Sequence, residues 1–244
     1  WAEQLEQRIV YEDGSLLVID KPSGLAVHGG SGLNFGMIEC LRQVRPHDRY
    51  LELVHRLDRD TSGLILVARR PAALRELHRL LREGRVDKRY LAVVRGFCPE
   101  NGTVDHALRD KPDGADRRSS TVQPAREAVT RYRRLATVEL PYAVDRYPTS
   151  RYSLVALTPL TGRRHQLRRH MKHLGHPIIG DAKHGKGVHN RFFKLRFGCP
   201  RLLLACTGLA FDHPVTGRRI ELSASPGDEF LTLLKAFGWS AHDV

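Results

Sequence analysis

Apolar and polar positions along the chain follow two spacings, which predicts strands mixed with helices. Short apolar runs bounded by turn residues predict strands, and apolar residues three or four positions apart predict amphipathic helices. Because the two kinds of run do not alternate regularly, we expect an α+β fold rather than a doubly wound one. The predicted strands are 9–11, 16–19, 63–68, 89–95, 129–140, 152–157, 201–204 and 209–211, and the predicted helices are 35–44, 72–82, 164–174 and 230–237.

Two polar stretches lie between these runs. Residues 99–127 are rich in Pro, Gly, Asp and Arg, which predicts a surface excursion rather than a domain boundary. The glycines Gly29, Gly30 and Gly32 predict a loop that either lines an active cleft or simply connects two elements. The glycines lack the order of a nucleotide P-loop. We therefore interpret residues 1–244 as one domain.

The charge of the chain narrows the class of partner. Lys and Arg number 40 against 27 Asp and Glu, which gives a formal net charge of +13. Such a balance favours a polyanion such as nucleic acid, although an Arg-rich proteome gives the same composition. No apolar run is long enough to predict a transmembrane helix. The four cysteines form no Cys-x-x-Cys pair, which indicates reduced thiols in a cytoplasmic protein.

Asp58 lies in a polar turn between two apolar runs. Its neighbours Arg56 and Arg59 are cations, and Asp60-Thr61-Ser62-Gly63 follows. A partly desolvated carboxylate beside cations is a candidate for chemistry. An Asp in a turn is more often a cap or the first residue of an Asx-turn, so the local pattern leaves its role open.

A second candidate is the basic run over residues 161–170. If this run is helical, Arg164 and Arg168 lie on one face, with His165 and Arg169 beside them. Like charges at this spacing destabilise a lone helix, which predicts a carboxylate or phosphate partner. The alternative is a solvated basic face.

Histidines at positions 165, 170, 173 and 176 invite a metal-site interpretation. No carboxylate shares their predicted helix, nearby cations would repel a dication, and the His-Glu-x-x-His pattern is absent. We expect no metal, and a metal-dependent nuclease is the least favoured hypothesis.

Tyr90 opens an apolar strand after Lys88-Arg89. A tyrosine at such a position is most often part of the core with a satisfied hydroxyl. It can also stack on a nucleobase or move a proton.

Residues 55–63 read His-Arg-Leu-Asp-Arg-Asp-Thr-Ser-Gly and resemble the signature of the RluA family of pseudouridine synthases. The resemblance covers nearly the whole chain. It implies a mixed, mostly antiparallel sheet split by a catalytic cleft with flanking helices, and no metal or organic cofactor. Four further stretches match in the same order: Lys21-Pro22-Ser23-Gly24, Lys88-x-Tyr90, Thr161-Gly162-Arg163-x-His165-Gln166-Leu167-Arg168, and Gly175-His176-Pro177-Ile178-Ile179-Gly180-Asp181.

The resemblance also implies roles for individual residues. Asp58 matches the catalytic aspartate, and Arg168 matches the arginine that forms an ion pair with it. Tyr90 matches a tyrosine that stacks on the target base and is placed to take its C5 proton. The resemblance leaves open whether Asp58 acts as a nucleophile or as a base. The expected RNA- and base-binding residues are Arg56, which would fill the gap left by the flipped uridine, Leu167, which would pack near the base, and His55, Arg163, Arg164, His165 and Lys21.

The two halves of the chain resemble different branches of the family. The first half is similar to enzymes of 23S rRNA (RluC) and the second half to enzymes of tRNA (TruC). We expect tRNA as the substrate, with 23S rRNA as the alternative. A non-catalytic RNA-binding or ribosome-assembly protein on the same fold is more distant. We also expect a cytoplasmic monomer without an S4-like RNA-binding module.

Overall fold

The computed structural model describes residues 2–29, 35–109 and 124–239; Gly30 and Gly32 of the predicted glycine loop lie outside these ranges. The helices are α1 (Ala2–Glu6), α2 (Met37–Val44), α3 (Pro71–Arg82), α4 (Gln166–His173), α5 (Gly187–Phe197) and α6 (Asp228–Ala236). The strands are β1 (Ile9–Glu12), β2 (Leu16–Lys21), β3 (Glu52–Leu53), β4 (Ser62–Ala68), β5 (Asp87–Arg95), β6 (Asn101–Asp105), β7 (Val129–Leu140), β8 (Ser150–Pro159), β9 (Leu204–Asp212) and β10 (Arg219–Ser223).

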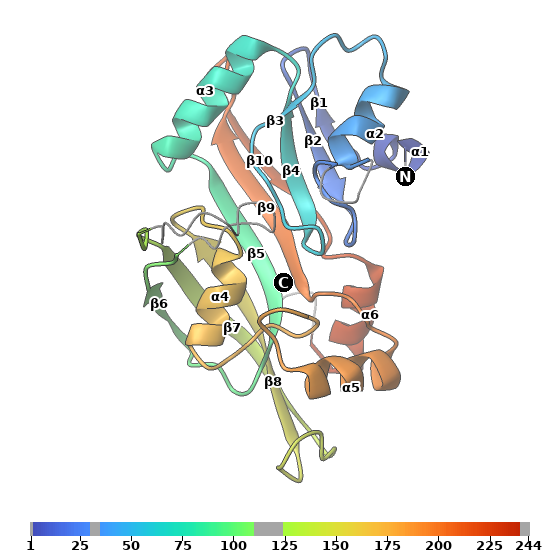
Figure 1. Cartoon of the computed structure of the whole chain (residues 1–244), viewed down its shortest axis with the longest axis vertical. Helices are drawn as coiled ribbons and strands as arrows, with labels where there is room; N and C mark the ends of the chain where they lie inside the picture. The colour runs from blue at the N-terminus through green and yellow to red at the C-terminus, as the bar shows by residue number, and fades with distance from the viewer. Residues whose placement is uncertain (1, 30–34, 110–123, 240–244) are drawn as a thin grey trace, which may run out of the picture.

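The strands form one mixed sheet in the order β1-β2-β4-β9-β5-β8-β7-β6, with β3 beside β4 and β10 beside β9 (Figure 1). Among the described strands, β4 and β9 are the one parallel pair, and they meet over only two residue pairs, Ser62 with Ala205 and Gly63 with Cys206. This short junction joins two antiparallel parts of the sheet. The observed architecture confirms the predicted α+β fold with a mostly antiparallel sheet.

Gly63 lets the two parts of the sheet approach at this junction. Its φ of 102° lies in the region that favours glycine. A Cβ atom at this position would overlap the backbone of Cys206. Tyr90 on β5 is in register with the same Cys206. The junction therefore brings the chain just before β4 close to the start of β5.

Strand β5 separates two hydrophobic cores, because successive side chains of a strand point to opposite faces. Tyr90, Ala92 and Val94 belong to the larger core. Leu91 and Val93 belong to a second core that includes aromatic residues of α5 and α6. In Figure 1 these two helices lie at one end of the molecule and α3 at the other. None of the helices within the described ranges is long and apolar enough to cross a membrane.

Besides the short α1 and β3, which were not predicted, the structure differs from the predicted elements in four places. Strand β6 lies within residues 99–127, which were predicted as an irregular surface excursion. Strand β9 is continuous where two short strands were predicted, because Gly208 continues the pairing with β5 past a register shift. Helix α5 was not predicted, since its apolar residues are not confined to one face: Phe193 is buried while Leu195 is 77% exposed. Strand β10 was also not predicted; its burial alternates between exposed and half-buried.

Candidate active site

The loop before β4 presents Asp58 at the junction of the two sheet parts. Its side chain remains 27% exposed. The backbone N–H of Thr61 donates to the Asp58 carbonyl over 3.1 Å, which closes a turn. The Ser23 hydroxyl donates to the Asp60 carbonyl over 2.6 Å, and the Gly24 N–H donates to the Arg59 carbonyl over 3.0 Å. The Lys-Pro-Ser-Gly stretch therefore holds the Asp58 loop in place.

Lys21 belongs to the framework of this loop, which corrects its predicted role as an RNA contact. The side chain is 0% exposed, so it cannot reach RNA in this arrangement. Its Nζ donates to the carbonyls of Pro22, Leu25 and Arg59 over 2.8, 2.8 and 2.9 Å. These three acceptors use every N–H of an ammonium group, although burial lowers the pKa of Lys21 to about 7.

Arg168 on α4 joins two carboxylates. Its Nη1 donates to Asp58 Oδ2 over 2.8 Å, which is the ion pair that the family resemblance implied. Its Nε and Nη2 donate to the two carboxylate oxygens of Asp181 over 2.7 and 2.8 Å. Burial lowers the pKa of Arg168, but its hydrogen bonds to the two carboxylates raise it more, so the net pKa lies above its ordinary value. A cation fixed in this way holds the Asp58 carboxylate in one orientation.

Asp181 is a site residue to which the sequence analysis gave no role, although it ends a stretch that matched the family. Its side chain is fully buried. Besides binding Arg168 through both oxygens, it accepts the backbone N–H groups of Lys183 and His184, each over 2.9 Å. Asn190 on α5 donates to the Asp181 carbonyl over 3.0 Å and accepts the Gly180 N–H over 2.8 Å. The bidentate contact fixes the plane of the guanidinium, so Asp181 orients the group that holds Asp58.

The start of α4 explains how Arg168 reaches Asp58. The Thr161 hydroxyl donates to Gln166 Oε1 over 2.7 Å, and the Arg163 N–H donates to the same oxygen over 3.0 Å. The buried Gln166 amide in turn donates to the Val129 carbonyl on β7 over 3.0 Å. The helix therefore begins one residue after His165, as part of the predicted basic helix, and is tied to the sheet.

His165 stands beside Asp58. Its φ of 52° makes it the one non-glycine residue of the described chain with a positive φ, and such backbone strain is often found at functional sites. Its Nε2 lies 3.9 Å from Asp58 Oδ1, and its Nδ1 lies 3.0 Å from His184 Nε2. Burial lowers the pKa of His165 and lowers that of His184 to about 4. A neutral imidazole pair therefore lines one side of the carboxylate.

Tyr90 and Leu167 supply the apolar part of the site. They are 8% and 7% exposed, and both belong to the larger core. Burial, followed by the neighbouring Cys206, raises the pKa of Tyr90 well above its ordinary value. The phenol is therefore neutral in the free protein, a state that suits stacking on a base.

The remaining predicted contacts are distributed around the loop and the start of α4. Arg56 is exposed two residues before Asp58. Arg164 is exposed, whereas Arg163 is half-buried and donates from Nε to the Glu127 carbonyl over 2.9 Å. His55 accepts the Leu66 N–H at Nε2 over 3.2 Å, and burial, followed by Lys88, lowers its pKa to about 3. His55 therefore stabilises the loop as a neutral side chain.

The other three histidines that were considered for a metal site contact separate partners. His170 lies 2.9 Å from Thr130 Oγ1, His173 stacks on His106, and His176 Nδ1 lies 2.8 Å from the Arg95 carbonyl. Within residues 2–29, 35–109 and 124–239, no group of three or more His, Cys, Asp or Glu side chains is placed to hold a metal ion.

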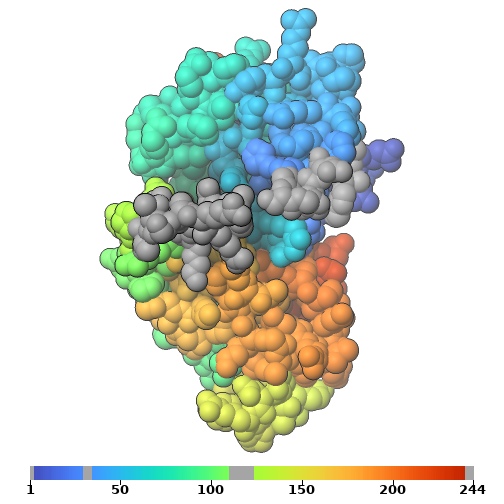
Figure 2. Space-filling model, in the orientation of Figure 1, coloured from blue at the N-terminus to red at the C-terminus, as the bar shows by residue number. Residues whose placement is uncertain are grey.

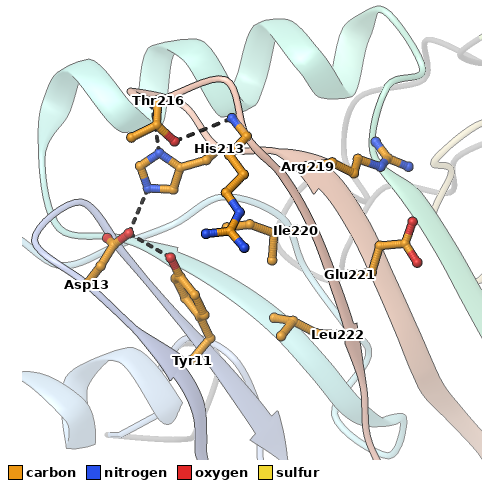
Figure 3. A pocket seen from close by; sticks show the side chains of 9 residues that line it. Tyr11, Asp13, His213, Thr216, Arg219, Ile220, Glu221 and Leu222 are labelled. Atoms are coloured by element: carbon orange, nitrogen blue, oxygen red, sulfur yellow. Dashed lines mark hydrogen bonds and ion pairs between the residues drawn. The ribbon is translucent and has the colours of Figure 1, made fainter.

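A separate polar cluster links the β1–β2 turn to the β9–β10 turn beside a hollow of about 550 Å³ (Figure 3). The Tyr11 hydroxyl donates to Asp13 Oδ2 over 2.9 Å, and His213 Nε2 lies 2.7 Å from the same oxygen. His213 Nδ1 accepts the N–H groups of Val215 and Thr216. Since Nδ1 is an acceptor, Nε2 carries the proton and donates to Asp13. Every group in the cluster has a partner, so we interpret it as a structural clasp.

The arrangement of Asp58, Tyr90 and Arg168 at the β4–β9 junction of a mixed, mostly antiparallel sheet agrees with a match to known proteins. Residues 15–173 match the family described as RNA pseudouridylate synthase, and the chain belongs to that family. It is therefore an isomerase that converts uridine in RNA to pseudouridine, as the sequence signature predicted.

Relatives and solved structures extend the match over most of the chain. The chain is 42% identical over 243 residues to tRNA pseudouridine synthase C of Haemophilus ducreyi, covering 98% of this chain and 99% of the relative. It is 44% identical over 235 residues to ribosomal large subunit pseudouridine synthase C of Pasteurella multocida, covering 96% and 68%. The structure of human RNA pseudouridylate synthase domain containing 4 has a TM-score of 0.74 at 26% identity, covering 97% and 95%. That of human domain containing 1 has a TM-score of 0.72 at 28% identity, covering 97% and 88%.

Proposed function

We propose that this chain isomerises a uridine of tRNA, with Asp58 as the catalytic residue. The observation that carries the assignment is a partly exposed carboxylate whose cation partner is itself fixed by a buried second carboxylate. Such a group is held in one orientation before substrate arrives, which lowers the cost of reaching the reactive geometry. Relatives named tRNA pseudouridine synthase C in Haemophilus ducreyi and Yersinia pestis support the choice of tRNA.

Each side chain of the proposed site has a role in the reaction. The C1′–N1 bond breaks, the uracil turns, C5 bonds to C1′, and N1 gains a proton while C5 loses one. Asp58 acts on the ribose, either by attacking C1′ or by removing a ribose proton. The uridine must leave its stack, so Arg56 fills the gap while Tyr90 and Leu167 hold the base. Because its phenol is neutral, Tyr90 can take the C5 proton only as a relay that passes its own hydroxyl proton to another acceptor, in the stage when the detached base lies against the hydroxyl.

Positive groups around Asp58 complete the proposed binding site. Arg164 is exposed at the start of α4, and cations at such a position bind phosphate without reading the base sequence. Arg163 reaches the loop that precedes β7. His165 and His55 contribute neutral rings that limit water around the base.

Ribosomal RNA is the second candidate substrate, because the large-subunit enzyme of Pasteurella multocida is as similar over the shared region as the tRNA enzymes are. Mapping pseudouridines in tRNA and 23S rRNA from a deletion strain separates the two. Loss of one tRNA pseudouridine, restored by the wild-type gene, supports the proposal; loss confined to 23S rRNA overturns the choice of tRNA.

We further propose that the enzyme acts as a monomer in the bacterial cytoplasm, where tRNA is modified. The relatives named above are bacterial RNA-modifying enzymes, which supports this location. Light scattering of the purified protein measures the oligomeric state, and a mass twice that of the chain would contradict the monomer.

A further inference from the structure

The segment from Lys183 to Phe197 concentrates positive charge. It contains five cations and no Asp or Glu. All five side chains are exposed, and no carboxylate of the described residues forms an ion pair with them. This contrasts with α3, where Arg79 pairs with Glu76 and Glu83. The five cations are Lys183, Lys186, Arg191, Lys194 and Arg196, and we call them the α5 cations.

The way α5 packs directs these cations outward. His189 and Phe193 face the second core, where they contact Tyr152. The opposite side of the helix carries Leu195, which is 77% exposed, and Val188, which is 48% exposed. The α5 cations, three of them on the helix and Lys183 and Lys186 just before it, are therefore exposed to solvent, and no ion pair with a carboxylate of the described residues neutralises them.

The hairpin between β7 and β8 extends this surface with arginines that lie over aromatic rings. Arg196 donates to the Tyr142 hydroxyl over 2.9 Å, which ties α5 to the hairpin. The guanidinium of Arg146 lies 5.3 Å from the ring centre of Tyr147. That of Arg151 lies 5.1 Å from the ring centre of Phe97 and also pairs with Glu139 Oε2 over 3.1 Å, so it is not counted as a phosphate contact. The ring holds the Arg146 guanidinium in place and leaves its N–H groups available for phosphate oxygens. Figure 2 shows the hairpin (yellow) beside α5 (orange) at one end of the molecule.

The surface is connected to the active site through a short rigid path. Asn190 on α5 makes two hydrogen bonds with the backbone at Gly180 and Asp181, and Asp181 holds Arg168. Helix α5 is therefore directly connected to the residues that hold the Asp58 carboxylate.

We propose that the outer face of α5, together with the β7–β8 hairpin, binds the sugar-phosphate backbone of the substrate RNA outside the uridine pocket. This inference rests on the proposed function and adds where the rest of the RNA lies. Its cations suit phosphate contacts rather than contacts with base edges. The surface therefore contributes affinity and positioning rather than sequence specificity.

The test removes three exposed α5 cations whose side chains have no partner in the described structure, in the triple variant Lys186→Gln, Arg191→Gln, Lys194→Gln. Binding of the full chain to unfractionated tRNA is measured by filter retention over a series of KCl concentrations. Each phosphate contact contributes about one to the slope of log K against log salt. We expect the slope to fall by about 2 to 3, binding near physiological salt to weaken at least about tenfold, and single-turnover kcat at saturating RNA to stay unchanged.

The matched control removes the same charge at the other end of the molecule, in the triple variant Arg70→Gln, Arg75→Gln, Arg82→Gln on and beside α3. These three side chains are also exposed. Equal slopes for the two triple variants overturn the inference, even if the wild-type protein makes pseudouridine. A wild-type protein that makes no pseudouridine overturns the proposed function instead, while the slope still reports on the surface.

Discussion

Arg168 lies between a buried and a partly exposed carboxylate, and this difference in exposure decides what each one does. Asp181 takes two of its donors and is shielded from solvent, so it works as an anchor. Asp58 takes the third contact and keeps its remaining surface for substrate. The sequence suggested the Asp58–Arg168 pair only through the family resemblance, because 110 residues separate them. It gave no sign that Arg168 has a second partner.

Asp181→Asn keeps the shape of the anchor but removes its charge. Removing one partner of a buried ion pair costs about 3–5 kcal/mol, so we expect a loss of that order in the free energy of unfolding at pH 7. We also expect lower kcat with nearly unchanged RNA affinity, because Arg168 no longer orients Asp58. Urea unfolding and single-turnover assays measure the two effects.

The difference in the free energy of unfolding between wild type and Asp181→Asn should depend on pH. Burial raises the pKa of Asp181, but hydrogen bonds from Arg168 and from the His184 and Lys183 N–H groups lower it more, so the net pKa is depressed. A depressed pKa stabilises the fold above the unfolded value near 4, and this contribution is lost as pH falls through the folded value. The stability gap between wild type and variant should therefore shrink below about pH 4. A gap that stays constant from pH 7 to pH 3 would contradict the assignment.

Lys21→Met tests the corrected role of Lys21. Three backbone carbonyls lose their donor, and each unsatisfied buried acceptor costs about 1–3 kcal/mol. We expect the free energy of unfolding to fall by about 3 kcal/mol or more, with the exposed Lys235→Met as a neutral control. If the two variants unfold alike while Lys21→Met alone loses RNA affinity, Lys21 contacts RNA after all.

At the level of elements, the parallel contact of β4 and β9 organises the site. We expect Gly63→Ala to destabilise the protein by at least about 2 kcal/mol, because the backbone conformation is strained for alanine and Cys206 blocks the added atom. Gly24→Ala is the control, since its φ is also positive but its Cβ would meet no atom within 4 Å. Thermal unfolding distinguishes them; an equal loss in both variants would show that strain alone, without the blocked approach, explains the effect.

Periodicity predicted the elements that have one clear apolar face. The predicted helix 72–82 corresponds to α3, and the predicted strand 63–68 corresponds to β4. Helix α5 escaped detection because aromatic residues lie around it, some in the second core and some near the hairpin. Strand β6 escaped because its polar residues are held by pairing with β7 rather than by burial. Both depend on partners that are distant in the sequence.

At the scale of the whole molecule, the net charge of +13 correctly indicated a nucleic-acid partner. Charge alone could not show where the cations gather, because that depends on which arginines pair with carboxylates in the fold. Arg45 and Arg69 share Glu12 and Asp48, whereas the α5 cations have no such partners. The fold thus neutralises some cations in ion pairs and leaves others exposed as a localised basic surface.

The central claim is that the Asp58 carboxylate carries out the isomerisation. The most direct measurement is tritium release from RNA labelled at uridine C5 by the purified Asp58→Asn protein, with Asp60→Asn as the matched control in the same loop. We expect no detectable release by Asp58→Asn, retained tRNA binding, and near-normal release by Asp60→Asn, whose 40% exposed carboxylate forms an ion pair only with Arg59 among the described residues. Pseudouridine formation by folded Asp58→Asn at a rate close to wild type would contradict this claim.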